Sequence, residues 1–427
     1  MEKRTQIHLG SLVGCVFICV LVFSGVCSLD NGLARTPPMG WMAWERFRCN
    51  VNCTEDPENC LSEKLIKKMA DRMVSLGLLD VGYEYVSIDD CWPTKERDSN
   101  GRLVPDPTRF PSGMKALGDY LHSKGLKFGI YEDFGTKTCG GFPGSEFYMS
   151  TDANTFAEWG VDMLKFDGCY SNINDMEIGY PTMEFFLNKT GRPILFSCSW
   201  PAYTQGIKTD YKLIRENCNM WRNYADIQDS WDSTYGIINH YGINKDGFSA
   251  FAGPGGWNDP DELIVGNFGL SYEQERAHMG MWAMMASPLF MSVDLRSIRN
   301  QSLALLKNKR LIAINQDPLG TQGRRVWKES DVELWVKPLQ TEGSLAIALL
   351  NSGNQGTPKR LSLPALSLML TNPLGYNLTE AFDGASMGSV FPNDTLKFSL
   401  NPTGILMMTA VPKVSSANLL MSLIFGQ

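Results

Sequence analysis

The sequence predicts a (β/α)8 barrel followed by a small antiparallel β-sandwich. The length of 427 residues suits a large domain with a smaller one beside it. Short apolar runs alternate with helical segments between residues 39 and 294, and the pattern changes to strand-like segments after about Leu319. A composition of 43% hydrophobic and 20% charged residues is typical of a globular protein.

The first segment has the features of a secretory signal peptide. A basic pair precedes an apolar stretch near residues 12–23, and Val26 and Ser28 supply small residues at the −3 and −1 positions of a cleavage site. We therefore expect residues 1–28 to be removed. A signal anchor is the alternative, but the apolar run is shorter than the ~20 residues that a membrane-spanning helix needs.

Cysteine content agrees with a secreted chain. Three of the 11 cysteines lie in the expected leader, and an even set is left, which predicts disulfides without fixing their pairing. Zinc binding is disfavoured because paired Cys-x-x-Cys knuckles are missing from the sequence. The eight mature cysteines are Cys49, Cys53, Cys60, Cys91, Cys139, Cys169, Cys198 and Cys218.

The mature chain is acidic and contains glycosylation sequons. Removing a leader of net charge +1 changes the formal net charge from −7 to −8, which disfavours nucleic acid and anionic membranes as partners. The sequons fit passage through the secretory pathway. Their acceptor residues are Asn52, Asn188, Asn300, Asn377 and Asn393.

Eight strand candidates, most of them ending in a polar group, form the barrel region over residues 29–320. Strand and helix alternate, which predicts a parallel sheet with its chemistry at the carboxyl ends of the strands. A doubly wound sheet is the alternative. The strand candidates are MGWMAW (39–44), YEYVSIDD (83–90), LKFGIYED (126–133), DMLKFDG (162–168), PILFSCSW (193–200), MWRNYAD (220–226), SAFAGPGGWNDPD (249–261) and PLFMSVD (288–294). The helical candidates are 62–77, 114–125, 155–160, 183–191, 211–217 and 274–287.

The remaining residues, 321–427, predict the β-sandwich. VELWVKPL (332–339), SLAIALLN (344–351) and LKFSL (396–400) are strand-like and are separated by Gly, Pro and Asn turns. The final apolar stretch, LLMSLIFGQ, is consistent with either a packed strand or a frayed end.

Carboxylates are the reactive groups that this chain supplies at its strand ends. His122, His240 and His278 are the only histidines of the mature chain, so catalytic triads and histidine metal sites have little support. Two carboxylates on either side of a glycosidic bond can hydrolyse it, one as nucleophile or base and the other as proton donor. This chemistry requires neither a metal nor an organic cofactor.

Two aspartates are the candidates for this pair. In MLKFDG, period-two alternation places Lys165 and Asp167 on one face of a strand, so the lysine would favour ionised Asp167. In WRNYAD, Asp226 ends a strand, and Arg222 lies four residues earlier on the same face. A structural salt bridge is the alternative for Asp167, and a helix N-cap is the alternative for Asp226.

Longer motifs around these residues resemble glycoside hydrolase family 27, which contains α-galactosidase A and α-N-acetylgalactosaminidase. The resemblance runs from LDNGLARTPPMGW to AINQDPLG, is weaker in the tail, and is carried by ERFRCN, IDDCW, RFPSG, LKFDGCY, WRNYADIQDSW, AGPGGWNDPD and GNFGLS. It implies a barrel followed by a β-sandwich, and retaining hydrolysis of terminal α-linked galactose-type sugars.

The same resemblance implies roles for individual residues. Asp167 would be the nucleophile and Asp226 the general acid/base. Asp89, Asp90 and Lys165 would recognise the axial 4-hydroxyl and its neighbours. The matching sugar-binding positions are Trp44, Asp89, Asp90, Tyr131, Lys165, Tyr203, Arg222 and Asp261. The implied disulfides are Cys49–Cys91, Cys53–Cys60, Cys139–Cys169 and Cys198–Cys218.

A short loop predicts the preferred sugar. Where α-galactosidase A has CEWPLY, this chain has CSWPAY, in which Ser199 and Ala202 are smaller. A 2-acetamido group should therefore fit, as in the α-N-acetylgalactosaminidases of the family. We expect N-acetylgalactosamine to be preferred and galactose to be tolerated.

Two glutamates depart from the family pattern. Glu132 in GIYED and Glu262 in DPDEL stand where relatives usually have Ala and Met. Strand alternation predicts that Glu132 faces away from Tyr131. Glu262 follows a sugar-binding position, so we expect it to alter the pH dependence or the aglycone preference.

The expected protein is a retaining exo-glycosidase that releases terminal α-linked N-acetylgalactosamine, and galactose less well, from glycoconjugates. Acidic conditions would keep the proton donor protonated, which agrees with a lysosomal location, although secretion from the cell is the alternative. The family implies a homodimer, and no stable membrane span is expected. A galactose-preferring α-galactosidase and an inactive sugar-binding lectin are the competing functions.

Overall fold

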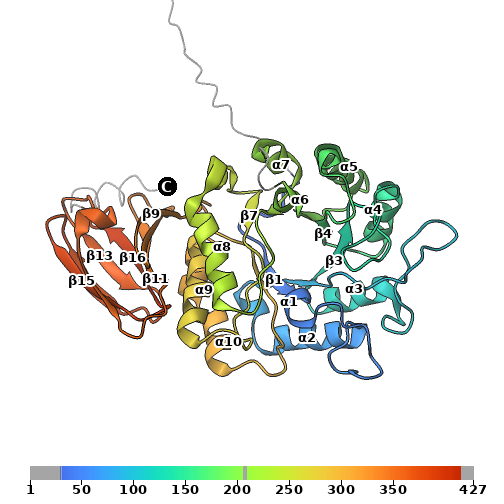
Figure 1. The fold of residues 1–427 in the computed structure, drawn as a ribbon, viewed down its shortest axis with the longest axis horizontal. Helices are drawn as coiled ribbons and strands as arrows, with labels where there is room; N and C mark the ends of the chain where they lie inside the picture. Colours follow the sequence, from blue (N-terminus) through green and yellow to red (C-terminus); the bar gives the residue numbers. More distant parts are fainter. Residues whose placement is uncertain (1–28, 30, 205–208, 415–427) are drawn as a thin grey trace, which may run out of the picture.

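The computed structural model describes residues 29, 31–204 and 209–414. The expected leader and the stretch LLMSLIFGQ therefore lie outside the described residues. Figure 1 shows a ring of helices around parallel strands, with a body of antiparallel strands beside helices α8 and α9. The predicted fold class, a (β/α)8 barrel with a C-terminal antiparallel β-sandwich, is confirmed.

The barrel strands pair in parallel in the order β7-β6-β5-β4-β3-β2-β1-β8. Beyond the end of β7, Leu263 closes the ring, because it forms a parallel bridge with Met291 and its N–H donates to the carbonyl of Phe290 at 2.7 Å. The strands are β1 (Met39–Met42), β2 (Tyr85–Ser87), β3 (Lys127–Asp133), β4 (Met163–Asp167), β5 (Leu195–Cys198), β6 (Met220–Arg222), β7 (Trp257–Asp259) and β8 (Leu289–Met291).

The helices cover the outside of the barrel through apolar faces and have typical caps. The Ser62 hydroxyl accepts from the N–H of Leu65 at the start of α2, and Ser271 and Gln274 form a capping box at α9. The helices are α1 (Trp44–Phe47), α2 (Glu63–Ser75), α3 (Gly113–Ser123), α4 (Met149–Glu158), α5 (Met176–Lys189), α6 (Trp200–Tyr203), α7 (Tyr211–Asn217), α8 (Trp231–Ile243), α9 (Tyr272–Met284), α10 (Asn300–Leu306) and α11 (Lys309–Asn315).

Strand alternation on β4 places the polar site directly above an apolar layer. Leu164 and Phe166 pack outwards in the main core, whereas Met163 belongs to a separate cluster inside the barrel. Lys165 and Asp167 follow Met163 on the same face of the strand. The other buried members of this inner cluster are Met42, Tyr85, Leu195, Met220, Trp257, Ala286 and Phe290.

The C-terminal region contains a six-stranded antiparallel sheet, β14-β13-β16-β11-β10-β9, and a two-stranded sheet, β12-β15. One face of the large sheet continues the core of the barrel through residues such as Trp335 and Met407, and the other forms its own core with Leu334 and Met408. The strands are β9 (Arg324–Glu329), β10 (Val332–Pro338), β11 (Leu345–Asn351), β12 (Lys359–Pro364), β13 (Tyr376–Glu380), β14 (Ser386–Val390), β15 (Thr395–Leu400) and β16 (Ile405–Pro412).

Buried charged groups lie at the junction between the two regions. Glu333 of β10 accepts from the Tyr235 hydroxyl of α8 at 2.7 Å and from Trp335 Nε1 at 2.9 Å. Lys337 of β10 is fully buried, and its ammonium donates to the carbonyl of Ile314 in α11 at 2.5 Å. Burial lowers the pKa of Lys337 to about 7.

Several predicted boundaries were wrong; helix α5, for example, begins at Met176, seven residues before its predicted start. The strand predicted at 220–226 ends at Arg222, so Asp226 lies in the following loop and not at a strand end. Its backbone leaves the ladder because the Arg222 guanidinium donates to the Tyr224 carbonyl at 3.3 Å and to the Asp226 carboxylate at 2.9 Å. The strand predicted at 249–261 forms only over β7, since its Gly-Pro-Gly-Gly segment makes turns. Helix α4 begins at Met149, six residues before its predicted start.

Four disulfides join the described cysteines in the pairs that the resemblance implies: Cys49–Cys91, Cys53–Cys60, Cys139–Cys169 and Cys198–Cys218. The five sequon asparagines are all exposed. Among the helices of the described residues, none combines the length and the apolar character needed to cross a membrane.

Candidate active site

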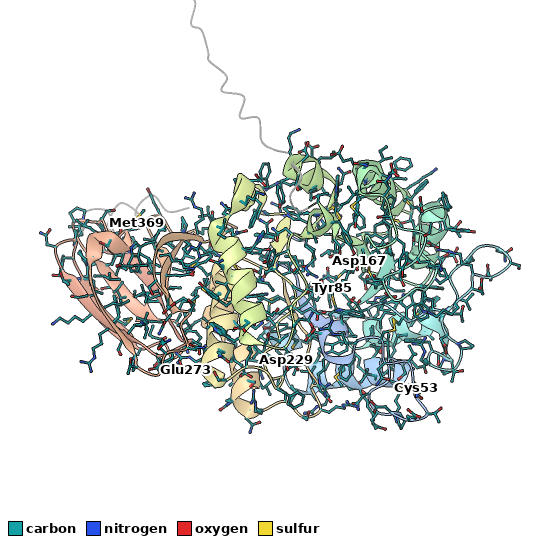
Figure 2. The ribbon with its side chains drawn as sticks, in the orientation of Figure 1. Cys53, Tyr85, Asp167, Asp229, Glu273 and Met369 are labelled. Carbon is teal, nitrogen blue, oxygen red and sulfur yellow. A yellow bond between two sulfur atoms is a disulfide. The ribbon has the colours of Figure 1, made fainter. Side chains whose placement is uncertain are left out.

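The carboxyl ends of the barrel strands open into a cavity of about 350 Å³. Every predicted catalytic or sugar-binding residue except Asp261 contributes to its lining. Figure 2 labels Asp167 within the ring of barrel helices. The lining residues are Trp44, Asp89, Asp90, Tyr131, Cys139, Lys165, Asp167, Cys169, Ser199, Ala202, Tyr203, Arg222, Tyr224, Ala225 and Asp226.

Asp167, the last residue of β4, is held by donors on two sides. The hydroxyl of Tyr131 from β3 donates to Oδ2 at 2.9 Å, and the hydroxyl of Tyr203 from α6 donates to Oδ1 at 2.7 Å. The N–H of Gly168 also donates to Oδ1, at 3.0 Å. These three hydrogen bonds fix the orientation of the carboxylate at the cavity surface.

Lys165 pairs with Asp89, whereas the sequence interpretation paired its charge with Asp167. Its ammonium donates to Asp89 Oδ2 at 2.7 Å, and the hydrogen-bond donors to Asp167 come from the two tyrosines and Gly168. Burial acts to lower the pKa of Lys165, but the charge of Asp89, followed by that of Glu262, raises it above its usual value. Lys165 is therefore a buried cation that pairs with a carboxylate in the cavity lining.

Asp89 and Asp90 follow β2 and are oriented by backbone donors. Asp89 Oδ1 accepts from the N–H of Asp90 at 2.9 Å, and Asp90 Oδ2 accepts from the N–H of Gly140 at 2.6 Å. Burial is the main cause that raises the pKa of both carboxyls. Both side chains are buried and line the same wall as Lys165.

Arg222 connects Asp226 with the loop after β7. Its guanidinium contacts Asp226 Oδ1 at 2.9 Å and Asp261 Oδ1 at 3.1 Å. The charge of Arg222 is the main cause that lowers the pKa of Asp226, whose side chain is 58% exposed. Asp226 is thus an accessible carboxyl that a single arginine orients.

Asp261 is fixed in a left-handed backbone conformation, with φ of 82°. Its N–H donates to Asp259 Oδ1 at 2.9 Å, and Trp282 Nε1 of α9 donates to its carbonyl at 2.8 Å. Its carboxylate also accepts from the N–H of Ile227 at 2.8 Å. A non-glycine residue keeps such a conformation only when its surroundings hold it, which these contacts do.

Ser199, the N-cap residue of the short helix α6, and Ala202 within that helix contribute small side chains to the cavity. The turn is held from behind, because the indole of Trp200 stacks on Tyr180 with ring centroids 5.5 Å apart. The Tyr180 hydroxyl in turn donates to the Asp167 carbonyl at 3.0 Å. The turn that carries Ser199 and Ala202 is therefore anchored to the strand that carries Asp167.

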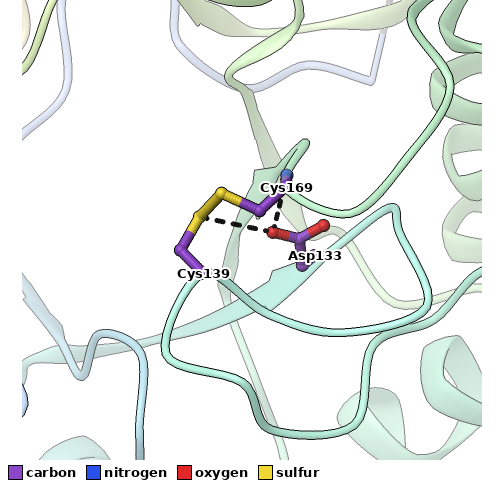
Figure 3. Close-up of side chains that lie close together, drawn as sticks. All are labelled: Asp133, Cys139 and Cys169. Carbon is purple, nitrogen blue, oxygen red and sulfur yellow. Dashed lines mark hydrogen bonds between the residues drawn. A yellow bond between two sulfur atoms is a disulfide. The ribbon is translucent and has the colours of Figure 1, made fainter.

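The Cys139–Cys169 disulfide forms part of the cavity wall. The sequence analysis did not predict this position. Cys139 Sγ lies 3.4 Å from Asp167 Oδ2, and Cys169 Sγ lies 3.2 Å from the Tyr203 hydroxyl. Figure 3 shows Asp133 beside this bond, where Oδ2 accepts from the N–H of Cys169 at 3.0 Å. Burial, followed by the charge of Asp167, raises the pKa of Asp133 to about 9.

This group is not a metal site in the oxidised protein. Asp133 and the two sulfurs offer atoms within 4.8 Å of one another. The sulfurs are bonded to each other, however, and thiolates are the form of cysteine that binds metals.

Tyr224 and Ala225 also line the cavity and were not predicted. Tyr224 stacks on His240 of α8 at a centroid distance of 4.2 Å. Burial lowers the pKa of His240 to about 4. Tyr224 lies between Arg222 and Asp226 in the motif WRNYAD, and its position beside these two predicted site residues is the signal that would have found it.

Glu132 and Glu262, the two glutamates that depart from the family pattern, lie in different parts of the structure. Glu132 lies outside the cavity lining, as alternation predicts, and its carboxylate is 3.8 Å from Arg97. Glu262 is buried behind the cavity, where Oε2 accepts from the N–H of Glu45 at 2.8 Å. Both glutamates are therefore buried, and each directly follows a predicted sugar-binding residue without lining the cavity itself.

Comparison with known proteins agrees with this arrangement. A family model described as alpha galactosidase A matches residues 36–317, and one for the alpha galactosidase A C-terminal beta sandwich domain matches residues 320–404. The chain is 52% identical to an alpha-N-acetylgalactosaminidase of Gallus gallus, covering 90% of this chain and 96% of that one. It is 48% identical to alpha-galactosidase A of Homo sapiens, covering 95% and 96%.

Solved structures share the fold. The alpha-galactosidase I of Mortierella vinacea superimposes with a TM-score of 0.80 at 33% identity, covering 91% of this chain and 100% of that chain.

Proposed function

Because the chain belongs to the α-galactosidase A family and is a glycoside hydrolase, we propose that it is a retaining exo-α-glycosidase that prefers terminal N-acetylgalactosamine over galactose. One observation carries this proposal: Asp167 and Asp226 line the same cavity, which is of a size to hold a single sugar. Tyr131 and Tyr203 orient the first carboxylate, and Arg222 orients the second.

In the proposed reaction, ionised Asp167 attacks the anomeric carbon and forms a glycosyl-enzyme bond. Protonated Asp226 donates its proton to the leaving glycosidic oxygen. Asp226 then removes a proton from water, which attacks the same carbon and frees Asp167. The Lys165–Asp89 pair and Asp90 bind the hydroxyls of the sugar, and Trp44 supplies an apolar surface for its carbon face.

The preference for N-acetylgalactosamine rests on the loop that carries Ser199 and Ala202. Both small side chains line the cavity and leave room for a 2-acetamido group, and galactose would leave part of that space unfilled. A galactose-preferring enzyme is the second candidate, since the human relative named α-galactosidase A is 48% identical over nearly the whole chain.

The experiment compares kcat/KM on nitrophenyl α-N-acetylgalactosaminide and nitrophenyl α-galactoside, and follows the anomer first released by NMR. We expect both substrates to be hydrolysed, the first faster, with the α-anomer released. A strong galactose preference would reject the sugar assignment, and release of the β-anomer would reject retention.

The wider setting of this activity is also a proposal. The barrel, residues 29–320, carries catalysis after removal of the leader, and residues 321–427 form a second domain. We infer action on glycolipids, glycoproteins or oligosaccharides in the lysosome, by a glycosylated homodimer. A lowered pKa of Asp226 supports an acidic compartment, because the donor must be protonated. Sedimentation of the purified protein as a monomer would reject the dimer.

A further inference from the structure

Arg48 is a half-buried cation beside the cavity, and the reaction proposed above gives it no role. It follows helix α1, whose first residue is Trp44. Its backbone φ of 48° lies in the left-handed region. The N–H of Arg48 donates to the Trp44 carbonyl at 2.8 Å, and a disulfide joins the next residue, Cys49, to Cys91. A non-glycine residue keeps such a backbone only where its surroundings hold it, so these contacts fix the point from which the side chain extends.

The Arg48 side chain joins α1 to the loop that carries Asp226. Its Nη2 forms an ion pair with the Glu45 carboxylate and donates to Gln228 Oε1 at 3.1 Å. Its Nε donates to the Glu45 carbonyl at 3.2 Å. The guanidinium carbon also lies 5.3 Å from the ring centroid of Trp44. One guanidinium therefore contacts both Trp44, which lines the cavity, and Gln228, which stands two residues after Asp226.

The α1 side of this connection is firmly held. Glu45 is buried, and its N–H donates to Glu262 Oε2 at 2.8 Å. A guanidinium is a planar fork of donors, so two fixed partners leave it little freedom. Anchored through Glu45, Arg48 can thus hold Gln228 at a set distance from α1.

The loop after β6 is where such a contact matters. The Asp226 side chain is 58% exposed. Arg222 donates to its carboxylate at 2.9 Å, and Asp261 accepts from the N–H of Ile227 at 2.8 Å. These two contacts come from β6 and from the loop after β7, whereas Arg48 approaches from α1. An exposed carboxyl that must donate a proton at one position gains precision when its loop is held from a further side.

We propose that Arg48 is a positioning residue for proton donation by Asp226. By holding Gln228 to α1, it keeps the Asp226 carboxyl in place for the leaving glycosidic oxygen. Arg48 exchanges no proton in this reaction and touches no reacting atom. The inference deepens the proposed function and rests on it, because Asp226 is taken to be the general acid.

The test varies how much the leaving group depends on the general acid. A dinitrophenolate departs with little protonation, whereas methoxide requires a well-placed proton donor. For Arg48→Met, we expect kcat/KM on methyl α-N-acetylgalactosaminide to fall about tenfold, the effect of losing one charge-assisted hydrogen bond. On the dinitrophenyl glycoside it should fall by less than about twofold. A loss of folded protein or of sugar binding would lower both values equally.

The two substrates are compared at the optimum pH of each variant. The charge of Arg222 is the main cause that lowers the pKa of Asp226, and the charges of Lys165 and Arg48 act in the same direction, against burial. Removal of Arg48 would therefore raise this pKa and move the alkaline limb of the pH profile. Measurement at the optimum keeps that shift apart from the loss of positioning.

Gln228→Met removes the same contact from its other side. It leaves the ion pair of Arg48 with Glu45 and the contact with Trp44 in place, so it replaces Arg48→Met if that variant fails to fold. We expect the same selective loss on the methyl glycoside. Combining both substitutions should cause no further loss, because they remove one interaction.

Arg46→Met is the matched control. Arg46 lies on the same short helix, is also half-buried and also lies over aromatic rings, with its guanidinium carbon 5.3 Å from the centroids of both Phe47 and Phe268. Neither ring belongs to the cavity lining. This variant should keep the wild-type ratio of the two kcat/KM values. Thermal unfolding of each variant checks that the protein is intact.

The outcomes separate the inference from the proposed function. Equal losses on the two glycosides in Arg48→Met would overturn the positioning role while leaving the enzyme assignment in place. A selective loss in Arg48→Met without one in Gln228→Met would also overturn it, since the arginine would then act on the leaving group directly. So would the same selective loss in Arg46→Met. A wild-type protein that hydrolyses neither glycoside would instead overturn the proposed function.

Discussion

The barrel mouth and the junction with the β-sandwich both bury charged side chains, but they satisfy them differently. At the mouth, Lys165 and Arg222 pair with aspartates beside a cavity, and hydrogen-bonding capacity is left over for a ligand. At the junction, Lys337 donates to the backbone carbonyls of Ile314 and Ala283 and is fully enclosed. Charged side chains thus line an open cavity in one place and join two regions of the protein in the other.

The largest difference in kcat between the two regions is expected when a residue at the barrel mouth loses its charge. Asp167→Asn should lower kcat by at least ~10³-fold, because the amide cannot form the glycosyl-enzyme bond, while sugar binding is retained. Single-turnover assays and calorimetry on the same preparation measure both properties. Lys337→Met at the junction should leave kcat near the wild-type value. A wild-type protein without turnover would instead favour the lectin.

The pH dependence of kcat/KM should be set by Asp226 at the barrel mouth and not by Lys337 at the junction. Asp226 must be protonated to act, and Arg222 lowers its pKa, so the active fraction is displaced to acidic pH. We expect kcat/KM to fall about tenfold per pH unit above the pKa of Asp226, because kcat/KM reports ionisation of the free enzyme. Initial rates across a buffer series measure it, and a maximum in the alkaline range would contradict the assignment.

The sugar preference should change when the small residues of the mouth are enlarged. Ser199→Glu combined with Ala202→Leu should fill the space for the 2-acetamido group. We expect the ratio of kcat/KM for N-acetylgalactosaminide over galactoside to fall by about 10–100-fold, a range typical of pocket size changes. The nitrophenyl pair measures this ratio. An unchanged ratio would show that another surface selects the sugar.

The smallest effect is expected on stability and concerns the junction. The folded pKa of Lys337 is lowered from 10.5 to about 7, so the unfolded chain binds more protons between these values and stability rises with pH in that window. Lys337→Met should remove this contribution, a difference of roughly 1–3 °C in Tm per pH unit. Calorimetry of both proteins from neutral to alkaline pH checks it. Parallel curves would mean that Lys337 does not titrate there.

Sequence patterns found the barrel because its strands are short apolar runs that end in polar groups. The alternation in MLKFDG correctly placed Lys165 and Asp167 on one face. The pairing of Lys165 with Asp89 could not be predicted from the sequence, because it depends on how β2 and β4 are spaced across β3. The roles of Asp167 and Asp226 remain predictions, although both residues line one cavity.

Other features were not predicted from the sequence, because local hydrogen bonds decide the backbone structure there and the hydrophobic periodicity does not. Residues 149–154 lack an apolar repeat, yet they form the first turns of α4, in which Asp152 accepts two hydrogen bonds from Arg97 at 2.6 and 2.7 Å. Asp226 leaves the sheet because Arg222 holds it in a loop. The disulfide in the cavity wall was missed because the spacing of cysteines in the sequence does not indicate which of them lie beside the strand ends.

The Cys139–Cys169 bond has a consequence for how the protein can be made and handled. Part of the surface that would meet the sugar exists only after two thiols have been oxidised, so a chain folded in a reducing cytosol would have a barrel with an unfinished wall. Dithiothreitol in an assay buffer would attack the same surface. Preparations should therefore be compared by their free thiol content before their turnover numbers are compared.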